Sequence, residues 1–362
     1  MQFGGRDIDG GPGRRKDLPA TFAGKWRTET MTGNREMNLA VVTGGAGFVG
    51  GHLVSHLLAR GVSVRSLDLR PHDLGKLGDG VDARAVDLCD PAALAAALDG
   101  ADTIFHLAGN PSGTISVENP RLDFNANALA GFNVLEVVRS MPGVRLVYLS
   151  SAMVYGRPPG TICREQDPCR PFYPYGASKL AVEHWLRAYV DAYGIDASLG
   201  RAFVVYGEGE DPARAGAEIG QYLRWHLNGL PIRVVGDPHA KIRDFVHVSD
   251  LADGLTAIAG RGETGEIYNI GSGTATSLYE LVRAIEEATA VPAQVEVDSR
   301  DLTDSYPLVA DIARLGELGY RPAVGLSDGL RRLAAELGPH PALPALPTVL
   351  SRVEKDVVGA VG

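Results

Sequence analysis

The stretch VVTGGAGFVGGHL, residues 41–53, constrains the fold of this chain more than any other feature. The apolar residues up to Thr43 predict a short buried strand, and the apolar-faced segment that begins at Phe48 predicts a helix. Between them Gly44, Gly47 and Gly50 recur at every third position. A strand, a glycine-rich turn and a helix in this order open a βαβ unit, so a parallel sheet is expected.

The rest of the chain continues this alternation. Further strands are predicted within 62–69, 101–109, 144–151 and 195–207, with helices within 91–100 and 124–140. Strands that alternate with helices indicate an α/β fold with a Rossmann-type, doubly wound parallel sheet. After about residue 205 the alternation weakens, which predicts a smaller lobe at the carboxyl edge of the sheet.

The turn has the chemistry of a dinucleotide site. Gly44 permits a tight turn, Gly47 allows a diphosphate to approach the backbone, and Gly50 allows close packing of the helix. The first helical N–H groups, around Phe48 and Val49, are then free to bind phosphate oxygens. Because strand, turn and helix occur together, a glycine-rich connection without a ligand is the weaker interpretation.

An acidic residue follows at the distance that such a site requires. Asp68 ends the second predicted strand, where a carboxylate binds the adenosine ribose hydroxyls and repels a 2′-phosphate. This favours NAD over NADP, although Arg70 lies close by and points the other way.

A tyrosine and a lysine lie one helical turn apart in FYPYGASKL. Tyr175 and Lys179 share a face near the start of a predicted helix. A phenol titrates near pH 10 in water, so a base at pH 7 needs a pKa lowered by about three units, or about 4 kcal/mol. The Lys179 ammonium and an oxidised nicotinamide would both act in that direction. Ser150 and Ser151 end another strand at the ligand-binding edge of the sheet, where a hydroxyl can hold a substrate oxygen.

Composition excludes several classes of protein. The 362 residues carry a formal net charge of −9 without a long basic stripe, which argues against a nucleic-acid partner. Three cysteines fit neither a disulfide framework nor a metal site, and we interpret them as free thiols in a reducing compartment. No apolar run approaches the length of a membrane span, and no secretory leader is visible. We therefore expect a cytoplasmic protein without a metal or membrane partner.

Five segments in order resemble the extended short-chain dehydrogenase/reductases. They are TGGAGFVG, HLAG, YLSSAMVYG, YGASK and RDFVHVSD, and the resemblance runs from about residue 37 to about residue 337. It is strongest to the branch of NAD-dependent sugar-nucleotide epimerases and dehydratases. It implies an NAD-binding domain over 37–205 with parts of 232–262, and a substrate-binding lobe over 206–231 and 263–338. The polar, Gly/Arg-rich composition of 1–36 predicts a disordered extension, and the Pro-rich stretch within 339–362 predicts an irregular tail.

The resemblance also implies roles for individual residues. Ser151, Tyr175 and Lys179 would be the catalytic triad. The cofactor-binding positions beyond the turn and Asp68 would be Asp87, Leu88, Leu107, Ala108, Asn127, Ser150, Tyr175 and Lys179. The substrate-binding positions would be Ser151, Tyr175, Val204, Arg243 and Arg300, with Arg243 on the diphosphate.

The sequence departs from the family pattern at several of these positions. Val204 stands where the family usually has an asparagine that holds the sugar nucleotide, and Ala130 with Gly131 replaces a Gly-Thr pair. Arg300 lies one residue further than usual from the residues that follow it. Ala152 and Met153 stand where the 4,6-dehydratases have an acidic pair, which argues against dehydration.

The sequence therefore predicts NAD-dependent epimerisation of a nucleotide-activated sugar, most simply at C4 through a keto intermediate, in a homodimer. A sugar-nucleotide decarboxylase or a net dehydrogenase/reductase shares the same first step. An alternative of another class is a sensor or scaffold that binds NAD without turnover, for which the catalytic triad would serve no purpose.

Overall fold

The computed structural model describes residues 34–70, 80–212, 218–299 and 305–344. The chain divides into two compact units, residues 1–34 and 35–362, and the description below concerns the second. Arg300, most of the predicted N-terminal extension and residues 345–362 of the predicted tail lie outside the described residues. In the described part of the chain, no helix is both long and apolar enough to cross a membrane.

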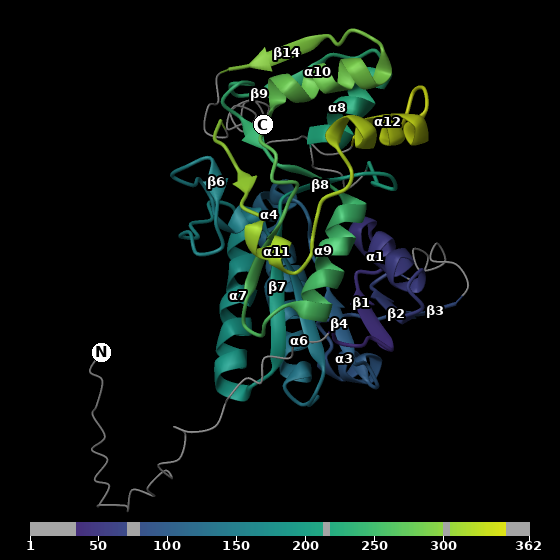
Figure 1. Ribbon diagram of the computed structural model, residues 1–362, viewed down its shortest axis with the longest axis vertical. Helices are drawn as coiled ribbons and strands as arrows, with labels where there is room; N and C mark the ends of the chain where they lie inside the picture. Colours follow the sequence, from purple (N-terminus) through teal and green to yellow (C-terminus); the bar gives the residue numbers. More distant parts are fainter. Residues whose placement is uncertain (1–33, 71–79, 213–217, 300–304, 345–362) are drawn as a thin grey trace, which may run out of the picture. The chain divides into compact units, whose positions relative to one another are not determined.

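A seven-stranded parallel sheet forms the centre of the structure (Figure 1). Its order is β12-β7-β5-β4-β1-β2-β3. The strands are β1 (Leu39–Thr43), β2 (Ser63–Asp68), β3 (Val81–Ala85), β4 (Thr103–His106), β5 (Arg145–Ser151), β7 (Asp196–Ala202) and β12 (Ile267–Ile270). From β1 the chain first builds outward through β2 and β3, then crosses to β4 on the other side. The crevice at the carboxyl ends of β1 and β4 is therefore the topological switch point, where doubly wound folds bind ligands.

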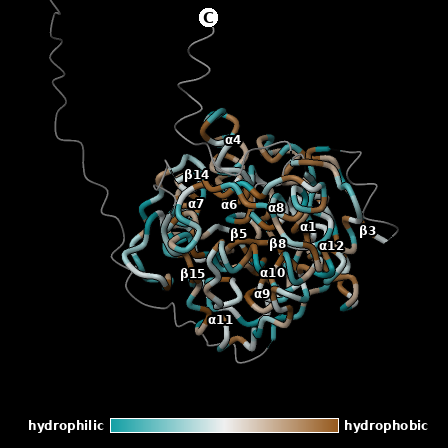
Figure 2. The backbone as a smooth tube through the Cα atoms, turned by 90° about the horizontal axis from the view of Figure 1, so that it is seen from above, coloured by the Kyte–Doolittle hydropathy of each residue, from teal (hydrophilic) through white to brown (hydrophobic). Residues whose placement is uncertain are grey.

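Helices cover both faces of this sheet, which confirms the predicted fold class. One face packs against α3 (Pro91–Leu98), α6 (Ala130–Val138) and α7 (Pro174–Tyr193). The other packs against α1 (Phe48–Leu58) and α9 (Val248–Arg261). Strand β1 shows the cause, because Val41 faces the first set while Ala40 and Val42 face the second. Viewed from above in Figure 2, hydrophobic stretches run through the central strands.

Shorter elements connect the sheet to the segments that flank the switch point. After β4 come α4 (Gly113–Glu118), α5 (Pro120–Asp123) and the π-helical turn η2 (Phe124–Leu129), which leads directly into α6. The 3₁₀ turn η3 (Ala152–Val154) follows β5. The predicted strand within 195–207 is interrupted at Phe203, and its second part, β8 (Val204–Tyr206), pairs with β11 (Phe245–His247) instead of joining the main sheet.

A smaller lobe has a hydrophobic core of its own. It contains α8 (Glu218–Leu227), α10 (Leu278–Thr289), α12 (Leu326–Leu337) and the parallel pair β9 (Ile232–Val235) and β14 (Val295–Asp298). Two further short pairs are β10 (Ile242–Arg243) with β13 (Thr276–Ser277), and β6 (Ile162–Cys163) with β15 (Val309–Ala310). Helix α11 (Ala313–Glu317) packs against β12 and α9.

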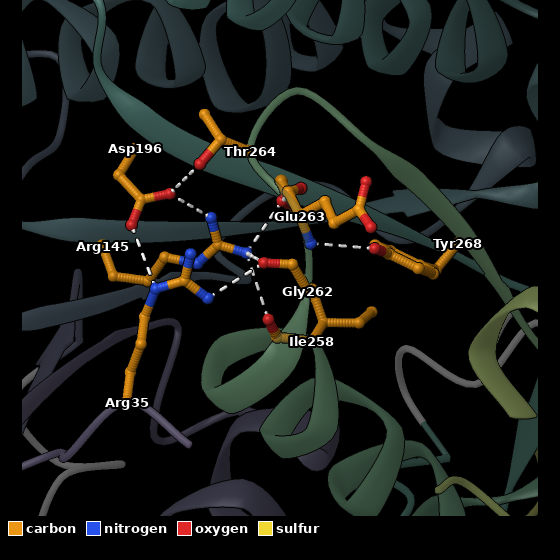
Figure 3. A network of polar contacts seen from close by, with 9 residues as sticks. Arg35, Arg145, Asp196, Ile258, Gly262, Glu263, Thr264 and Tyr268 are labelled. Atoms are coloured by element: carbon orange, nitrogen blue, oxygen red, sulfur yellow. Dashed lines mark hydrogen bonds and ion pairs between the residues drawn. The ribbon is translucent and has the colours of Figure 1, made fainter. Parts of the chain in front are cut away.

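Two predicted boundaries differ from the structure. Strand β12 lies within 263–338, which the sequence assigned to the lobe, yet it pairs with β7 and completes the main sheet. The N-terminal boundary also begins earlier than residue 37. Arg35 donates from its backbone N–H to the Gly260 carbonyl at 2.9 Å and lies 3.2 Å from the Asp196 carboxylate. Figure 3 shows this network, in which Arg145 also pairs with Asp196.

Candidate active site

The glycine-rich turn is packed so closely that three of its positions have no room for a side chain. Gly44 has a φ of +72°, and a Cβ there would lie 2.9 Å from the Ala108 backbone. A Cβ on Gly50 would overlap the Gly44 carbonyl oxygen, so this glycine brings the helix against the turn itself. A Cβ on Gly45, a position that no motif argument singled out, would overlap the Ser66 hydroxyl, which is a side-chain contact and not a backbone one. The turn thus leaves a backbone-lined cradle at the switch point.

The helix that follows the cradle can bind an anion. Gly47 is its N-cap, donates to the Gly44 carbonyl at 3.0 Å, and provides no capping side chain. The first turn, which starts at Phe48 and Val49, contains no acidic residue, and no described side chain caps it. Unpaired N–H groups and the helix dipole favour a phosphate at this point. The cradle and the uncapped helix therefore fit the diphosphate of NAD.

Asp68 lies at the carboxyl end of β2, as predicted, and its side chain is largely buried. Arg70 contacts the same carboxylate from its backbone N–H at 3.4 Å and from Nε at 4.0 Å. Asp87 is more exposed and accepts a hydrogen bond from the Cys89 N–H at 2.8 Å, which gives it a turn-forming role as well.

The predicted lining of the cofactor cleft is held by one hydroxyl. Leu107 and Ala108 follow β4, and their N–H groups donate to Thr43 Oγ1 at 3.2 and 3.1 Å. Leu88 is buried, and its carbonyl accepts from Asn133. Thr43 was not among the predicted site residues, although its position just before the glycines is the signal that could have identified it.

Asn127 is fully buried and connects three segments. Its Oδ1 accepts from the Asn110 N–H at 3.0 Å, and its Nδ2 donates to Asp123 at 2.9 Å and to Ser178 at 3.2 Å. A Cβ on Gly109 would overlap Asn127 Oδ1 and lie 3.6 Å from Lys179 Nζ. Asn127 therefore fixes the chain after β4 beside the lysine, which favours a structural role next to the predicted cofactor role.

Tyr175 and Lys179 lie in the first turns of α7, on the face that packs against β5 and η3. Burial raises the pKa of Tyr175 to about 12, and a hydrogen bond with Ser151 offsets part of that rise. The sequence analysis expected Lys179 to lower this pKa, but Lys179 is not among the groups that shift it here. Without a bound cation beside it, the phenol is protonated at neutral pH.

Lys179 is buried and is held in place by the backbone. Its Nζ donates to the Leu149 carbonyl at 3.0 Å and lies 5.1 Å from the centre of the Tyr148 ring. Burial lowers the pKa of Lys179 to about 8, while Asp123 and Glu183 act in the opposite direction. The ammonium is therefore the main form at pH 7, close to its point of titration.

The two serines at the end of β5 point to different partners. Ser151 reaches Tyr175 and also accepts from the Met153 N–H at 3.3 Å. Ser150 instead donates to Glu183, which forms a buried ion pair with Arg201. In this structure its hydroxyl is occupied within the interior, so the predicted cofactor role of Ser150 is not the contact that it makes.

Two of the predicted substrate residues, Val204 and Arg243, lie beside the lobe. Val204 begins β8, and its N–H donates to the Asp244 carbonyl at 3.0 Å. Arg243 is buried, donates to the Tyr306 carbonyl at 2.6 Å, and lies over the Tyr306 ring. Its Nε is 3.8 Å from Glu218. Local partners thus hold the Arg243 guanidinium.

His106 and the three cysteines have no metal-binding arrangement among the described residues. His106 is a core histidine, bonded to Thr43 at 2.8 Å, and burial lowers its pKa to about 3. Cys89, Cys163 and Cys169 are free thiols. Among the described residues, no three histidine, cysteine or acidic side chains group as metal ligands.

Comparison with known proteins places this geometry in a family. Residues 40–271 match the model of the NAD dependent epimerase/dehydratase family. The chain is 33% identical to a UDP-glucose 4-epimerase of Mycolicibacterium smegmatis over 81% of this chain and 96% of that one. It is 32% identical to a dTDP-glucose 4,6-dehydratase of an Actinoplanes species, over 82% and 96%.

A solved structure is similar over the same range. The crystal structure of the Thermus thermophilus UDP-glucose 4-epimerase in complex with NAD aligns with a TM-score of 0.74 at 33% identity. The alignment covers 82% of this chain and 98% of that one.

Proposed function

The chain belongs to the NAD-dependent epimerase/dehydratase family, with NAD as its cofactor, and we propose that it epimerises a nucleotide-activated sugar at C4. One observation carries this proposal. The hydrogen-bonded pair of Ser151 and Tyr175, with Lys179 one turn further along α7, lies at the sheet edge that carries the glycine cradle.

The chain after β4 connects the glycine cradle to Lys179. Gly44 packs against Ala108, and the next residue, Gly109, lies beside Lys179 Nζ. A dinucleotide bound through its diphosphate on α1 would therefore run past β4 toward Lys179 and Tyr175. The site is built at the carboxyl ends of three adjacent strands. The glycine cradle follows β1, Ala108 and Gly109 follow β4, and Ser151 ends β5.

Each of the three side chains has a distinct task. Tyr175, as phenolate, removes the proton from the sugar hydroxyl, and Ser151 positions that hydroxyl by a hydrogen bond. The Lys179 ammonium would bind the nicotinamide ribose. NAD, when bound, would supply a reversible hydride acceptor for the sugar carbon, and its positive ring would favour the ionised form of the phenol.

The pKa of Tyr175 supports this division of work. Its phenol is protonated in the absence of cofactor, since burial raises its pKa to about 12. Proton removal would then begin only when cofactor is bound beside it. The site beside Ser151 and Tyr175 would have to hold the proposed keto form of the sugar in two orientations.

The nucleotide part of the substrate is proposed to lie toward the lobe. Relatives in this comparison act on UDP-glucose and dTDP-glucose. Arg243 has the fork geometry that suits a diphosphate, and Arg300 is a further predicted contact. Val204 offers no side-chain polar contact, so the sugar pose should differ from that of relatives with asparagine there.

Other reactions of the family are less well supported. Ala152 and Met153 follow Ser151 where a 4,6-dehydratase needs acidic groups, and both are apolar. A decarboxylase or a net dehydrogenase/reductase remains the second candidate, because it shares the same first step and differs in its product and in the net release of NADH. A non-catalytic NAD sensor would have no use for the buried Ser151, Tyr175 and Lys179 arrangement.

We also propose a homodimer formed through a helical face. Leu122 of α5 and Phe124 of η2 are 45% and 47% exposed, and both elements pack against α7. Tyr193, at the end of α7, is 54% exposed. Large exposed apolar side chains on neighbouring elements are typical of a protein interface.

The first experiment is a substrate screen with the purified protein. UDP-, dTDP-, GDP- and CDP-sugars are incubated with it, and the sugars are identified by NMR. We expect an isomer of equal mass without net NADH. Loss of carbon dioxide or water, or stoichiometric NADH, would instead assign the decarboxylase, dehydratase or dehydrogenase reaction.

A further inference from the structure

Two buried carboxylates that no motif identifies lie on α7 itself and on α5, which packs against α7. Asp123 ends α5 and is 1% exposed, and Glu183 lies one turn after Lys179 on α7 and is 4% exposed. Tyr175, Lys179 and Glu183 are thus spaced four residues apart along one face of a single helix.

Glu183 is fixed by two partners. Arg201 of β7 contacts both of its carboxylate oxygens, with the shortest distance 2.6 Å, and Ser150 donates to Oε1. Because Ser150 precedes Ser151, this contact also holds the end of β5 beside Tyr175. A bidentate guanidinium–carboxylate pair in the interior has a defined geometry, so the charge of Glu183 has a fixed position.

Asp123 is fixed by two amide side chains. Its Oδ1 accepts from Asn110 Nδ2 at 2.8 Å and from Asn127 Nδ2 at 2.9 Å. Both donors are neutral amides, so the Asp123 charge is solvated by hydrogen bonds without being neutralised. Asn127 in turn contacts Ser178, the residue before Lys179.

A buried ammonium needs such charges. Lys179 is 5% exposed, and the one hydrogen bond described for its Nζ is to the Leu149 carbonyl. The other titratable or charged groups around it are Tyr175 on α7, His106 on β4, Tyr148 on β5, and Arg201 behind Glu183. His106 is neutral, so Asp123 and Glu183 are the negative charges of this set at neutral pH.

We propose that Asp123 and Glu183 are positioning residues that act through Lys179, holding it as an ammonium beside Tyr175. They are not expected to touch substrate or cofactor. Their effects on the two catalytic groups differ. Both raise the pKa of Lys179, but only Asp123 also raises the pKa of Tyr175.

The test measures Lys179 directly, in full-length protein without added substrate. Protein labelled with ¹³C-lysine is titrated, and the Lys179 Cε resonance is assigned by its loss in Lys179→Arg. Asp123→Asn and Glu183→Gln should each lower the Lys179 pKa by about one unit. Glu183→Asp, which keeps the charge, and the exposed control Asp191→Asn on the same helix should leave it near the wild-type value.

Charge and packing are separated by a further variant. Ser150→Ala removes a hydrogen bond to Glu183 but no charge, so it should not shift the midpoint of the Lys179 Cε titration. Glu183→Gln leaves Arg201 without a counter-ion and can fail to fold. If Glu183→Gln does not fold, Asp123→Asn tests the proposal alone, because its side-chain oxygen can still accept from Asn110 and Asn127. An unchanged Lys179 pKa in folded Asp123→Asn would overturn the proposal.

A second readout rests on the proposed function. In a pH profile of kcat/KM, the acid limb reports the Tyr175 phenolate and the alkaline limb reports the Lys179 ammonium. Glu183→Gln should move only the alkaline limb to lower pH, whereas Asp123→Asn should move both limbs to lower pH. If no sugar nucleotide were turned over, the NMR titration would still test the carboxylates.

Discussion

At the scale of single residues, the dinucleotide turn depends on missing side chains. Gly50 and Gly51 are neighbours in α1, yet their surroundings differ. A Cβ on Gly50 would overlap backbone atoms of Gly44 and Gly45, whereas one on Gly51 would meet a carbonyl oxygen only at 3.8 Å. Backbone atoms cannot move aside as a flexible side chain can, so only the first position should be intolerant.

Substitution of these two glycines tests that difference. Gly50→Ala should lower the free energy of unfolding by about 2 kcal/mol or more, and should weaken NAD binding at least tenfold by deforming the cradle. Gly51→Ala should change stability by no more than about 1 kcal/mol, with a gain expected from helix propensity. Urea unfolding and a fluorescence titration with NAD measure both effects, and equal behaviour of the two variants would contradict the packing argument.

The proposed catalytic pair, Tyr175 and Ser151, gives a separate prediction at the same scale. Tyr175→Phe should reduce kcat about 10³-fold, because no other described group is placed to take the proton, and Ser151→Ala should reduce it about 10²-fold. Both should leave the dissociation constant of NAD within about twofold, since neither residue forms the cradle. Steady-state kinetics and NAD titration measure this, and full activity of Tyr175→Phe would refute the mechanism.

At the scale of elements, the sequence predicted the central α/β alternation well, because strand and helix periods are local properties. The Tyr175–Lys179 helix and the glycine turn were visible for the same reason. The place of β12 was not, since IYNI carries no sign of which sheet it joins. The orientation of Ser150 toward Glu183 was equally hidden, because it depends on Arg201 from another strand.

The C-terminal end of α9 shows how distant segments support one element. Arg145 of β5 donates to the Ile258 and Gly262 carbonyls, each at 3.1 Å, and Arg35 donates to the Gly262 carbonyl at 2.9 Å (Figure 3). Both arginines also pair with Asp196. Positive charges at a helix C-terminus satisfy its free carbonyls and its dipole.

Replacement of these arginines by alanine should lower the free energy of unfolding, and the loss should be larger where the arginine side chain is more buried. The Arg145 side chain is 3% exposed, so Arg145→Ala should lower the free energy of unfolding by about 3 kcal/mol. Arg35→Ala should cost about 1 kcal/mol. Arg60→Ala serves as control, because its pair with Asp253 is half exposed and should contribute less than about 0.5 kcal/mol. Urea denaturation ranks the three, and a larger loss for Arg60 than for Arg145 would contradict this account.

At the scale of the whole molecule, the exposed apolar side chains of α5 and η2 remain to be explained. They lie on the helical layer of the NAD-binding sheet, and Asp123, between Leu122 and Phe124, faces inward toward Asn110 and Asn127. A homodimer through this face would therefore stabilise the segment that holds Asp123 beside Lys179. Assembly and catalysis would then be coupled through one short stretch of chain.

A charged residue on this face tests the coupling. Phe124→Glu should convert a dimer into a monomer in sedimentation velocity, because burying an unpaired carboxylate opposes association. The control is Val297→Glu, at a 49% exposed apolar position on β14, which should leave the dimer intact. A monomeric wild-type protein would reject the dimer. If Phe124→Glu were monomeric but kept the wild-type Lys179 titration, the interface would stand and the coupling to the active site would not.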